Sequence, residues 1–87
     1  MGSRLAISQS ERRFYVRVGL QLKGARESRG LSQIDVADVV GLTNSMIGYV
    51  ERGRTRASLF LLVRWCAFLE LDLAQLLAQA VVPEEKP

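Results

Sequence analysis

The stretch of sequence that decides the fold is SQIDVADVVGLTNSMIGYVERG, residues 32–53. Ser32 followed by Asp35 is a capping box, in which a hydroxyl and a carboxylate accept hydrogen bonds from the backbone amides that begin a helix. Gly41 suits the left-handed conformation that commonly ends a helix. After the turn, Thr43 caps a second helix, which a glycine also ends. The stretch therefore predicts two short helices joined by a tight turn.

Helices of about eight and nine residues joined by such a turn have the helix-turn-helix layout, in which the second helix lies in the major groove of duplex DNA. One face of that second helix is apolar and is expected to be buried; it carries Met46, Ile47 and Val50. The opposite face offers groups that can reach base edges and phosphates; it comprises Asn44, Ser45, Gly48, Tyr49 and Arg52. In the preceding helix the residues expected to face inward are Ile34, Val36, Ala37 and Val40.

The segment before this motif predicts a further helix. It is expected to begin at a cap on Ser8 and to end at a left-handed glycine, Gly30. Two internal glycines, Gly19 and Gly24, each weaken a helix by about 1 kcal/mol. We therefore expect the first half of this segment, residues 11–17, to be an arm or a separate turn.

Two more helices are predicted after the motif. Ser58 caps one that extends to about Leu69, and Asp72 with Gln75 opens another that ends near Gln79. The sequence contains neither internal repeats nor the alternation of a strand. The predicted fold is therefore all-α, with five short helices. The expected parts are an N-terminal arm (1–13, partly a cloning remnant), a helix-turn-helix domain (14–79) and a C-terminal tail (80–87).

The composition of this 87-residue chain excludes several classes of protein. Apolar residues make up 48% of it, enough for a packed core. With one cysteine and no histidine, we expect neither a disulfide framework nor a zinc site. The sequence also has no phosphate-binding loop, which argues against an enzyme. The longest apolar runs have five residues, far fewer than the ~20 that cross a bilayer. We expect a cytoplasmic protein that is not an enzyme and binds no metal, cofactor, small-molecule ligand or membrane.

The positive charge is unevenly distributed along the chain. Up to Leu69 there are 11 Lys and Arg against 5 Asp and Glu, whereas from Glu70 onward there are 1 and 4. Ten of the 12 cationic residues are arginine, whose planar fork matches phosphate geometry. This bias favours a polyanionic partner, although an ordinary solvated surface would also account for it.

The helix-turn-helix motif at residues 32–53 and the segments around it resemble the XRE family of phage-repressor and Cro-like DNA-binding domains. The resemblance covers residues 18–77 and rests on RGLSQ at 29–33, GLTNS at 41–45 and VERG at 50–53. It implies a five-helix, lambda-repressor-like fold with the helix-turn-helix at residues 32–53. It also implies double-stranded DNA as the partner.

The resemblance further implies the roles of individual residues. The implied base contacts are Asn44, Ser45 and Tyr49. The implied phosphate contacts are Gln33, Thr43, Arg52, Arg54 and Arg56. The implied structural ion pair, between the first and third helices, is Arg26 with Glu51. Alternatives stay open: Tyr49 could be half-buried packing, and Gln33 or any of the three arginines could be merely solvated. Ala57 replaces a proline of the family, which leaves the direction of Arg56 open.

The helix predicted at residues 58–69 has more apolar residues than one face can hold. The family core positions are Leu59, Leu62, Val63, Cys66 and Leu69, with Cys66 as packing rather than as a redox sensor. The surplus is a surface that small monomers seldom expose. We expect it to form a homodimer interface through Phe60, Leu61, Arg64, Trp65 and Phe68. The alternative is that some of these rings cover the core edge or residues 14–16.

Together these features predict a sequence-specific transcriptional regulator, more specifically a repressor that binds an inverted-repeat operator as a homodimer. Two alternatives share the fold. One is an antitoxin or a restriction–modification controller protein, of which the antitoxin would bind a second protein. The other is a protein-interaction module in which the apolar helix at residues 58–69 is the binding surface.

Overall fold

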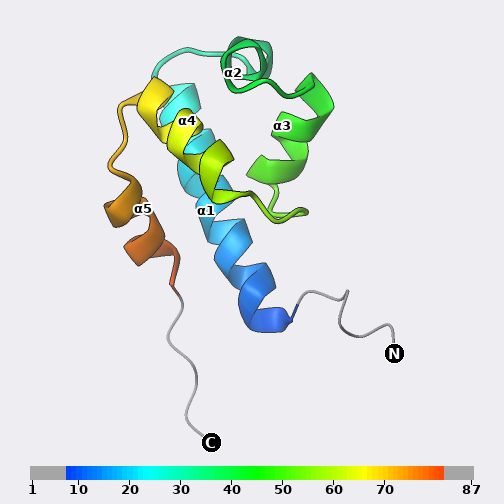
Figure 1. Cartoon of the computed structure of the whole chain (residues 1–87), viewed down its shortest axis with the longest axis vertical. Helices are drawn as coiled ribbons and strands as arrows, with labels where there is room; N and C mark the ends of the chain where they lie inside the picture. Colours follow the sequence, from blue (N-terminus) through cyan, green and yellow to red (C-terminus); the bar gives the residue numbers. More distant parts are fainter. Residues whose placement is uncertain (1–7, 82–87) are drawn as a thin grey trace, which may run out of the picture.

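The computed structural model describes residues 8–81, which form five helices and no strand. The helices are α1 (Gln9–Ser28), α2 (Gln33–Val40), α3 (Asn44–Glu51), α4 (Leu59–Leu69) and α5 (Leu73–Ala80). Figure 1 shows α1 running through the molecule, with α4 packed across it, α3 on one flank and α5 on the other. The predicted all-α fold is confirmed. No helix among residues 8–81 is both long and apolar enough to cross a membrane.

The helix-turn-helix begins and ends where the sequence predicts. At the start of α2 both bonds of the capping box are present: Ser32 Oγ accepts from the Asp35 amide at 3.2 Å, and Asp35 Oδ2 accepts from the Ser32 amide at 2.8 Å. These bonds hold the pKa of the Asp35 carboxyl below its ordinary value. Gly41 ends α2 with φ 79°. The turn geometry is therefore fixed by local chemistry.

The next three helices begin in one common way. The side chain of the residue before each helix accepts a hydrogen bond from a backbone amide three residues later. The cap residues are Thr43 at 3.2 Å, Ser58 at 3.1 Å and Asp72 at 3.1 Å. The predicted starts of α3, α4 and α5 are confirmed.

The first helix begins at its predicted cap, where Ser8 Oγ accepts from the Glu11 amide at 3.1 Å, but α1 is continuous over 20 residues and has no break before Gly19. Gly19 lies where α1 passes close to α3: a Cβ there would stand 2.3 Å from the Glu51 carbonyl oxygen. The glycine thus serves close packing between helices. The expected boundary after residue 13 falls inside α1, and Ala80, expected in the tail, is the buried last residue of α5. The remaining arm and tail, residues 1–7 and 82–87, lie outside the described residues.

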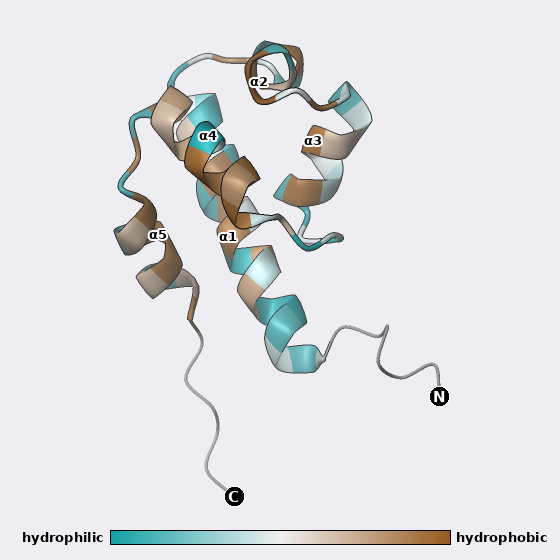
Figure 2. Cartoon of the chain, in the orientation of Figure 1, coloured by the Kyte–Doolittle hydropathy of each residue, from teal (hydrophilic) through white to brown (hydrophobic). Residues whose placement is uncertain are grey.

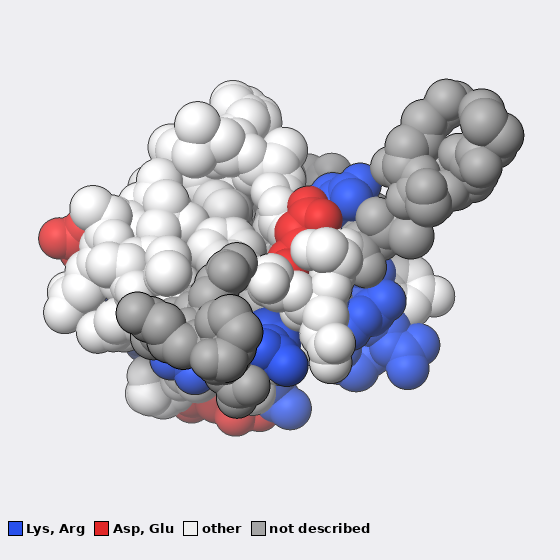
Figure 3. Space-filling model, turned by 90° about the horizontal axis from the view of Figure 1, so that it is seen from below, with Lys and Arg blue, Asp and Glu red and all other residues white. Residues whose placement is uncertain are grey.

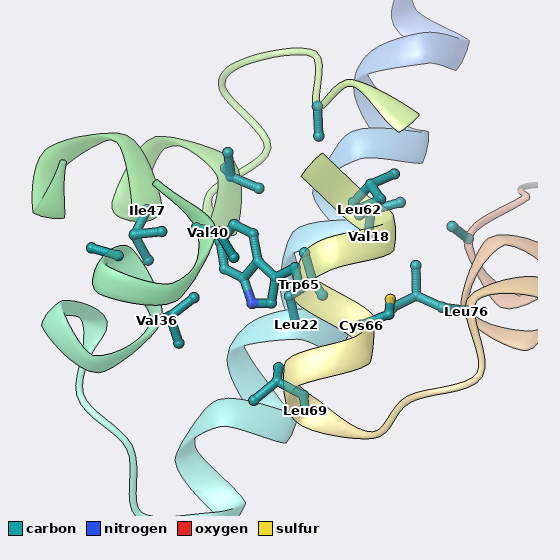
Figure 4. Close-up of a cluster of buried hydrophobic side chains, with 14 residues drawn as sticks. Val18, Leu22, Val36, Val40, Ile47, Leu62, Trp65, Cys66, Leu69 and Leu76 are labelled. Atoms are coloured by element: carbon teal, nitrogen blue, oxygen red, sulfur yellow. The ribbon is translucent and has the colours of Figure 1, made fainter. Parts of the chain in front are cut away.

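The core gathers around Trp65 of α4, whose side chain is fully buried (Figure 4). The other large, fully buried side chains are Leu22, Ile47, Leu69, Val18 and Val36. The predicted dimer role of Trp65 is therefore wrong. A helix buries one stripe, and in α4 that stripe is Leu62, Trp65, Cys66 and Leu69.

Four other burial expectations are wrong for the same reason, and one of them is Met46 of α3, which is 38% exposed. Ile34 is 58% exposed, because the buried stripe of α2 is Val36, Ala37 and Val40. Leu59 and Val63, expected in the core, are exposed on α4. Figure 2 shows that α4 is apolar over much of its length, whereas the first turns of α1 are hydrophilic.

Candidate nucleic-acid interface

The orientation of α3 is fixed by a buried ion pair with α1. Arg26 Nε donates to Glu51 Oε2 at 2.6 Å, and Arg26 Nη2 donates to Glu51 Oε1 at 3.0 Å. The same guanidinium donates to the Leu31 carbonyl at 2.8 Å. Hydrogen bonding to Glu51 raises the pKa of Arg26. Glu51 is only 3% exposed, so this pair supplies the counter-charge and hydrogen bonds that a buried carboxylate requires.

Gln33 extends this ion pair to α2. Its side-chain Nε2 donates to Glu51 Oε1 at 3.2 Å, and the side chain is half-buried. Gln33, an expected phosphate contact, has its side-chain amide on the carboxylate that ends α3. Arg26, Glu51 and Gln33 therefore link the first three helices in one network.

The side of α3 away from this network is exposed. Asn44, Ser45 and Arg52 are exposed, and Tyr49 is 44% exposed. The Arg52 guanidinium lies 5.5 Å from the centre of the Tyr49 ring, within the range of a cation–π contact. The structure thus brings four of the expected contact residues together on one polar surface. Gly48, expected on this face, is buried instead.

Thr43 is exposed at the start of α3, and its hydroxyl is the cap that accepts from the Met46 amide. The phosphate contact expected of Thr43 would therefore be additional to its structural role as the cap of α3. Helix N-termini offer free amides and a positive dipole end to anions.

The two loop arginines after α3 differ from each other. Arg54 is exposed, and no acidic side chain among residues 8–81 pairs with it. Arg56 donates to both carboxylate oxygens of Glu11 in α1, at 2.9 and 3.2 Å. These bonds lower the pKa of Glu11 and raise that of Arg56. The direction of Arg56, which the sequence left open, is therefore toward Glu11, because α1 begins early enough to bring that residue to the loop.

A groove beside α3 adds a cation that no sequence motif indicates. Its polar lining includes Lys23 of α1, Gln33 of α2 and Arg52 directly after α3. Lys23 has no local motif around it, so only the packing of α1 against α3 reveals its place. Lys and Arg side chains gather on one side of the molecule in Figure 3, and an uncharged area occupies the other.

The α4 surface keeps only part of its predicted dimer interface. Phe60 is 69% exposed, whereas Leu61 and Phe68 are half-buried against the core. Arg64 Nη2 donates to the Val39 carbonyl at 2.6 Å, near the end of α2, so its guanidinium is used within the chain. The exposed apolar side chains of α4 are Leu59, Phe60 and Val63, which we call the α4 patch.

Nothing in the described part of the chain suggests a metal centre, since residues 8–81 contain no cluster of three His, Cys, Asp or Glu side chains. The single thiol, Cys66, is buried, and burial raises its pKa.

Comparisons with known proteins agree with this geometry. The restriction-modification controller protein C.AhdI from Aeromonas hydrophila is 34% identical, with a TM-score of 0.66 over 71% of this chain and 94% of that one. Two structures of the clp gene regulator ClgR from Corynebacterium glutamicum are 25% identical, with TM-scores of 0.72 and 0.71. Each covers 77% of this chain, which in turn covers 71% and 87% of those chains. None of the curated protein sequences matches the chain.

The family match covers the elements described above. The helix-turn-helix family matches residues 22–76, which run from the middle of α1 into α5. This range contains the buried ion pair, the capping box and the exposed polar side of α3. With its own sequence motifs, its five-helix fold and this match, the chain belongs to the helix-turn-helix family of the XRE type.

Proposed function

We propose that the protein is a transcriptional regulator that binds duplex DNA in a sequence-specific manner through α3. The single observation that carries this proposal is the buried network of Arg26, Glu51 and Gln33 behind an exposed polar helix face. A reading helix must keep its position while its polar side faces water, and this network supplies that rigidity. The family match and the two regulators among the similar structures support the same function.

The exposed groups on α3 divide into two roles. Asn44 and Ser45 are the base contacts: an asparagine amide can pair with both N6 and N7 of adenine, and serine accepts several bases. Tyr49 lies one turn further along the same side. Arg52 and Arg54 contact phosphates, which fixes register without reading sequence. Affinity is then largely electrostatic and falls with salt, whereas specificity comes from α3.

The test begins with selection of bound duplexes from a random pool at moderate salt. We expect one preferred sequence to emerge. Replacing Asn44→Ala should then cost about 1–3 kcal/mol at one base position and relax the preference there. Arg54→Ala should weaken all sequences alike and flatten the salt dependence. A pool without enrichment, or an unchanged base preference in Asn44→Ala, would contradict the proposal.

The finer proposal is a repressor that binds as a homodimer through the α4 patch. Exposed Leu59, Phe60 and Val63 form an apolar surface on the helix, and apolar patches of this kind mark association sites. A two-fold pair of subunits requires inverted half-sites about one helical turn apart. We expect Phe60→Glu with Val63→Glu to halve the mass in light scattering and to weaken binding to a full operator. Leu20→Glu on α1, which is as exposed, is the control and should keep the wild-type mass.

A second candidate is a restriction–modification controller, which the 34% identity to C.AhdI favours. It would bind DNA through the same face of α3, so the difference lies in the gene controlled. If the selected sequence lies in front of a restriction gene or its own gene, the controller is favoured. Co-purification of a second protein would favour an antitoxin instead. An unproductive pool with an intact fold would favour an interaction module.

A further inference from the structure

We infer that the first nine residues of α1, residues 9–17, form an additional contact with the DNA backbone beside the half-site that α3 reads. This segment is called the α1 extension, and the inference rests on the proposed DNA binding. The extension precedes the family match, which begins at residue 22. Its own chemistry must therefore explain what it does.

The extension carries cations at the end of a helix where they are unfavourable. Arg12 and Arg13 lie within the first five residues of α1, near the positive end of the helix dipole, which disfavours cations there. Both are exposed, and among residues 8–81 no acidic side chain pairs with either. A local rule broken without compensation inside the fold commonly marks a functional surface. An external polyanion would supply the missing compensation.

The extension is held in place by two sets of contacts. On one side, Glu11 accepts two hydrogen bonds from Arg56, and the loop after α3 packs so tightly that a Cβ on Gly53 would stand 2.5 Å from the Val16 Cα. On the other side, Arg17 donates twice to the Gln79 carbonyl in α5, at 3.2 and 2.8 Å. The extension is therefore a fixed part of the domain.

This attachment places the extension beside the loop that follows α3. The Glu11–Arg56 pair neutralises one cation of that loop and ties the first turns of α1 to it, and Arg12 and Arg13 directly follow Glu11 in these turns. Arg54, proposed above as a phosphate contact, lies in this loop next to Gly53. Nine helical residues span about 13 Å, which is several phosphate spacings along one strand. Arginine at this position continues the backbone contacts of the loop along the flanking duplex.

The experiment compares Arg12→Gln, Arg13→Gln and the double variant with Arg29→Gln. Arg29 is also exposed and lies just after the other end of α1, so its replacement removes the same charge away from the loop. Binding to the selected sequence is measured across salt concentrations on a duplex with long flanks and on one trimmed to the selected bases. Each arginine of the extension should reduce the slope of log K against log salt by about 0.9 on the long duplex. The base preference should stay as in wild type.

Several outcomes separate this inference from the function on which it rests. If the double variant keeps the wild-type slope with an unchanged circular dichroism spectrum, the extension does not contact DNA. An equal loss in Arg29→Gln, or an equal loss on the trimmed duplex, would also overturn it, since either would reflect general charge. A wild-type protein that binds no duplex would overturn the proposed function and the inference together. Wild-type salt slopes in all variants, with selection of the same sequence, would overturn the inference alone.

Discussion

Helices α3 and α4 both begin with a hydroxyl cap, and both bury one stripe in the same core. They differ in what holds them and in what they expose. The end of α3 is held by the Arg26–Glu51 pair and by a close approach to Gly19, and its outer side is polar. The centre of α4 is held by the buried Trp65, and its outer side carries the apolar α4 patch.

This difference shows how one small core can present two kinds of surface. Apolar packing tolerates adjustment of side chains, whereas a bidentate ion pair fixes distance and direction together. A helix that must align with base edges benefits from the fixed geometry of an ion pair. A helix that packs against another apolar surface needs only apolar packing. We therefore expect α3 and α4 to respond differently to substitution, as the following experiments test.

The largest effect is expected in the core beneath α4. Trp65→Ala should destabilise the protein by about 3–5 kcal/mol, because it removes a fully buried ring and leaves a cavity. Phe60→Ala, on the exposed side of the same helix, should change the stability of the monomer by only about 0.5 kcal/mol. Urea unfolding of both variants measures the difference. Similar losses would mean that Phe60 also packs in the core.

The next effect concerns the ion pair beneath α3. Glu51→Gln should cost about 3 kcal/mol, because the Arg26 guanidinium would be left buried without its counter-charge. Glu27→Gln is the control, since its carboxylate is exposed and 3.8 Å from Arg26; exposed pairs contribute about 0–1 kcal/mol. Urea midpoints report both values. Equal costs would show that the hydrogen-bond geometry at Glu51 has no special role.

The third test compares two glycines of α1. Gly19→Ala should destabilise by about 1–3 kcal/mol although alanine favours helices, since its Cβ would stand 2.3 and 2.5 Å from two carbonyl oxygens of α3. Gly24→Ala, which has nothing within 4 Å, should stabilise by about 0.5–1 kcal/mol. Thermal melts distinguish the signs. A stabilised Gly19→Ala would contradict the close contact between α1 and α3.

A smaller effect should be common to the two helices. Thr43→Ala and Ser58→Ala each remove a cap that accepts one backbone amide, and each should cost about 1 kcal/mol. Chemical unfolding at neutral pH gives both costs. Because the caps are alike, the two costs should agree. A large difference between them would show that α3 and α4 also differ in how strongly their first turns are stabilised.

The smallest effect is a pH dependence of the stability, which arises from Cys66 in α4. Burial, and to a lesser degree the charge of Asp72, raises the pKa of the Cys66 thiol. A raised pKa in the folded state means that the stability is fully present below the ordinary thiol pKa of about 8.5 and declines as the pH rises above it. At pH 8 the native thiol should react slowly with iodoacetamide and the urea-unfolded thiol quickly. Equal rates would place Cys66 at the surface.

The helix-turn-helix could be predicted from the sequence because its signals are local. Ser32 bonds with Asp35, and Thr43 with the amide of Met46, three residues away in each case. Such contacts form within one turn whatever the rest of the chain does. The five helices and the polar side of α3 followed from them. The pairing of Arg26 with Glu51 followed from the family resemblance.

The positions that the sequence misplaced or left open depend on distant partners. Arg56 pairs with Glu11, 45 residues away, and Arg64 bonds to the Val39 carbonyl, 25 residues away. Neither contact leaves a local pattern. In α4 the apolar residues extend around most of the helix, so periodicity could not say which stripe is buried. The structure places Trp65 inside and Phe60 outside.

The sequence by itself determined where each helix from α2 to α5 begins and which side of α3 is polar, because caps and glycines act over three or four residues. Only the tertiary structure decided that α1 is unbroken, that Gln33 bonds to Glu51 and that Glu11 holds the loop arginine. Those outcomes depend on which helices touch. Contacts between residues far apart in the chain form only when the whole core is packed.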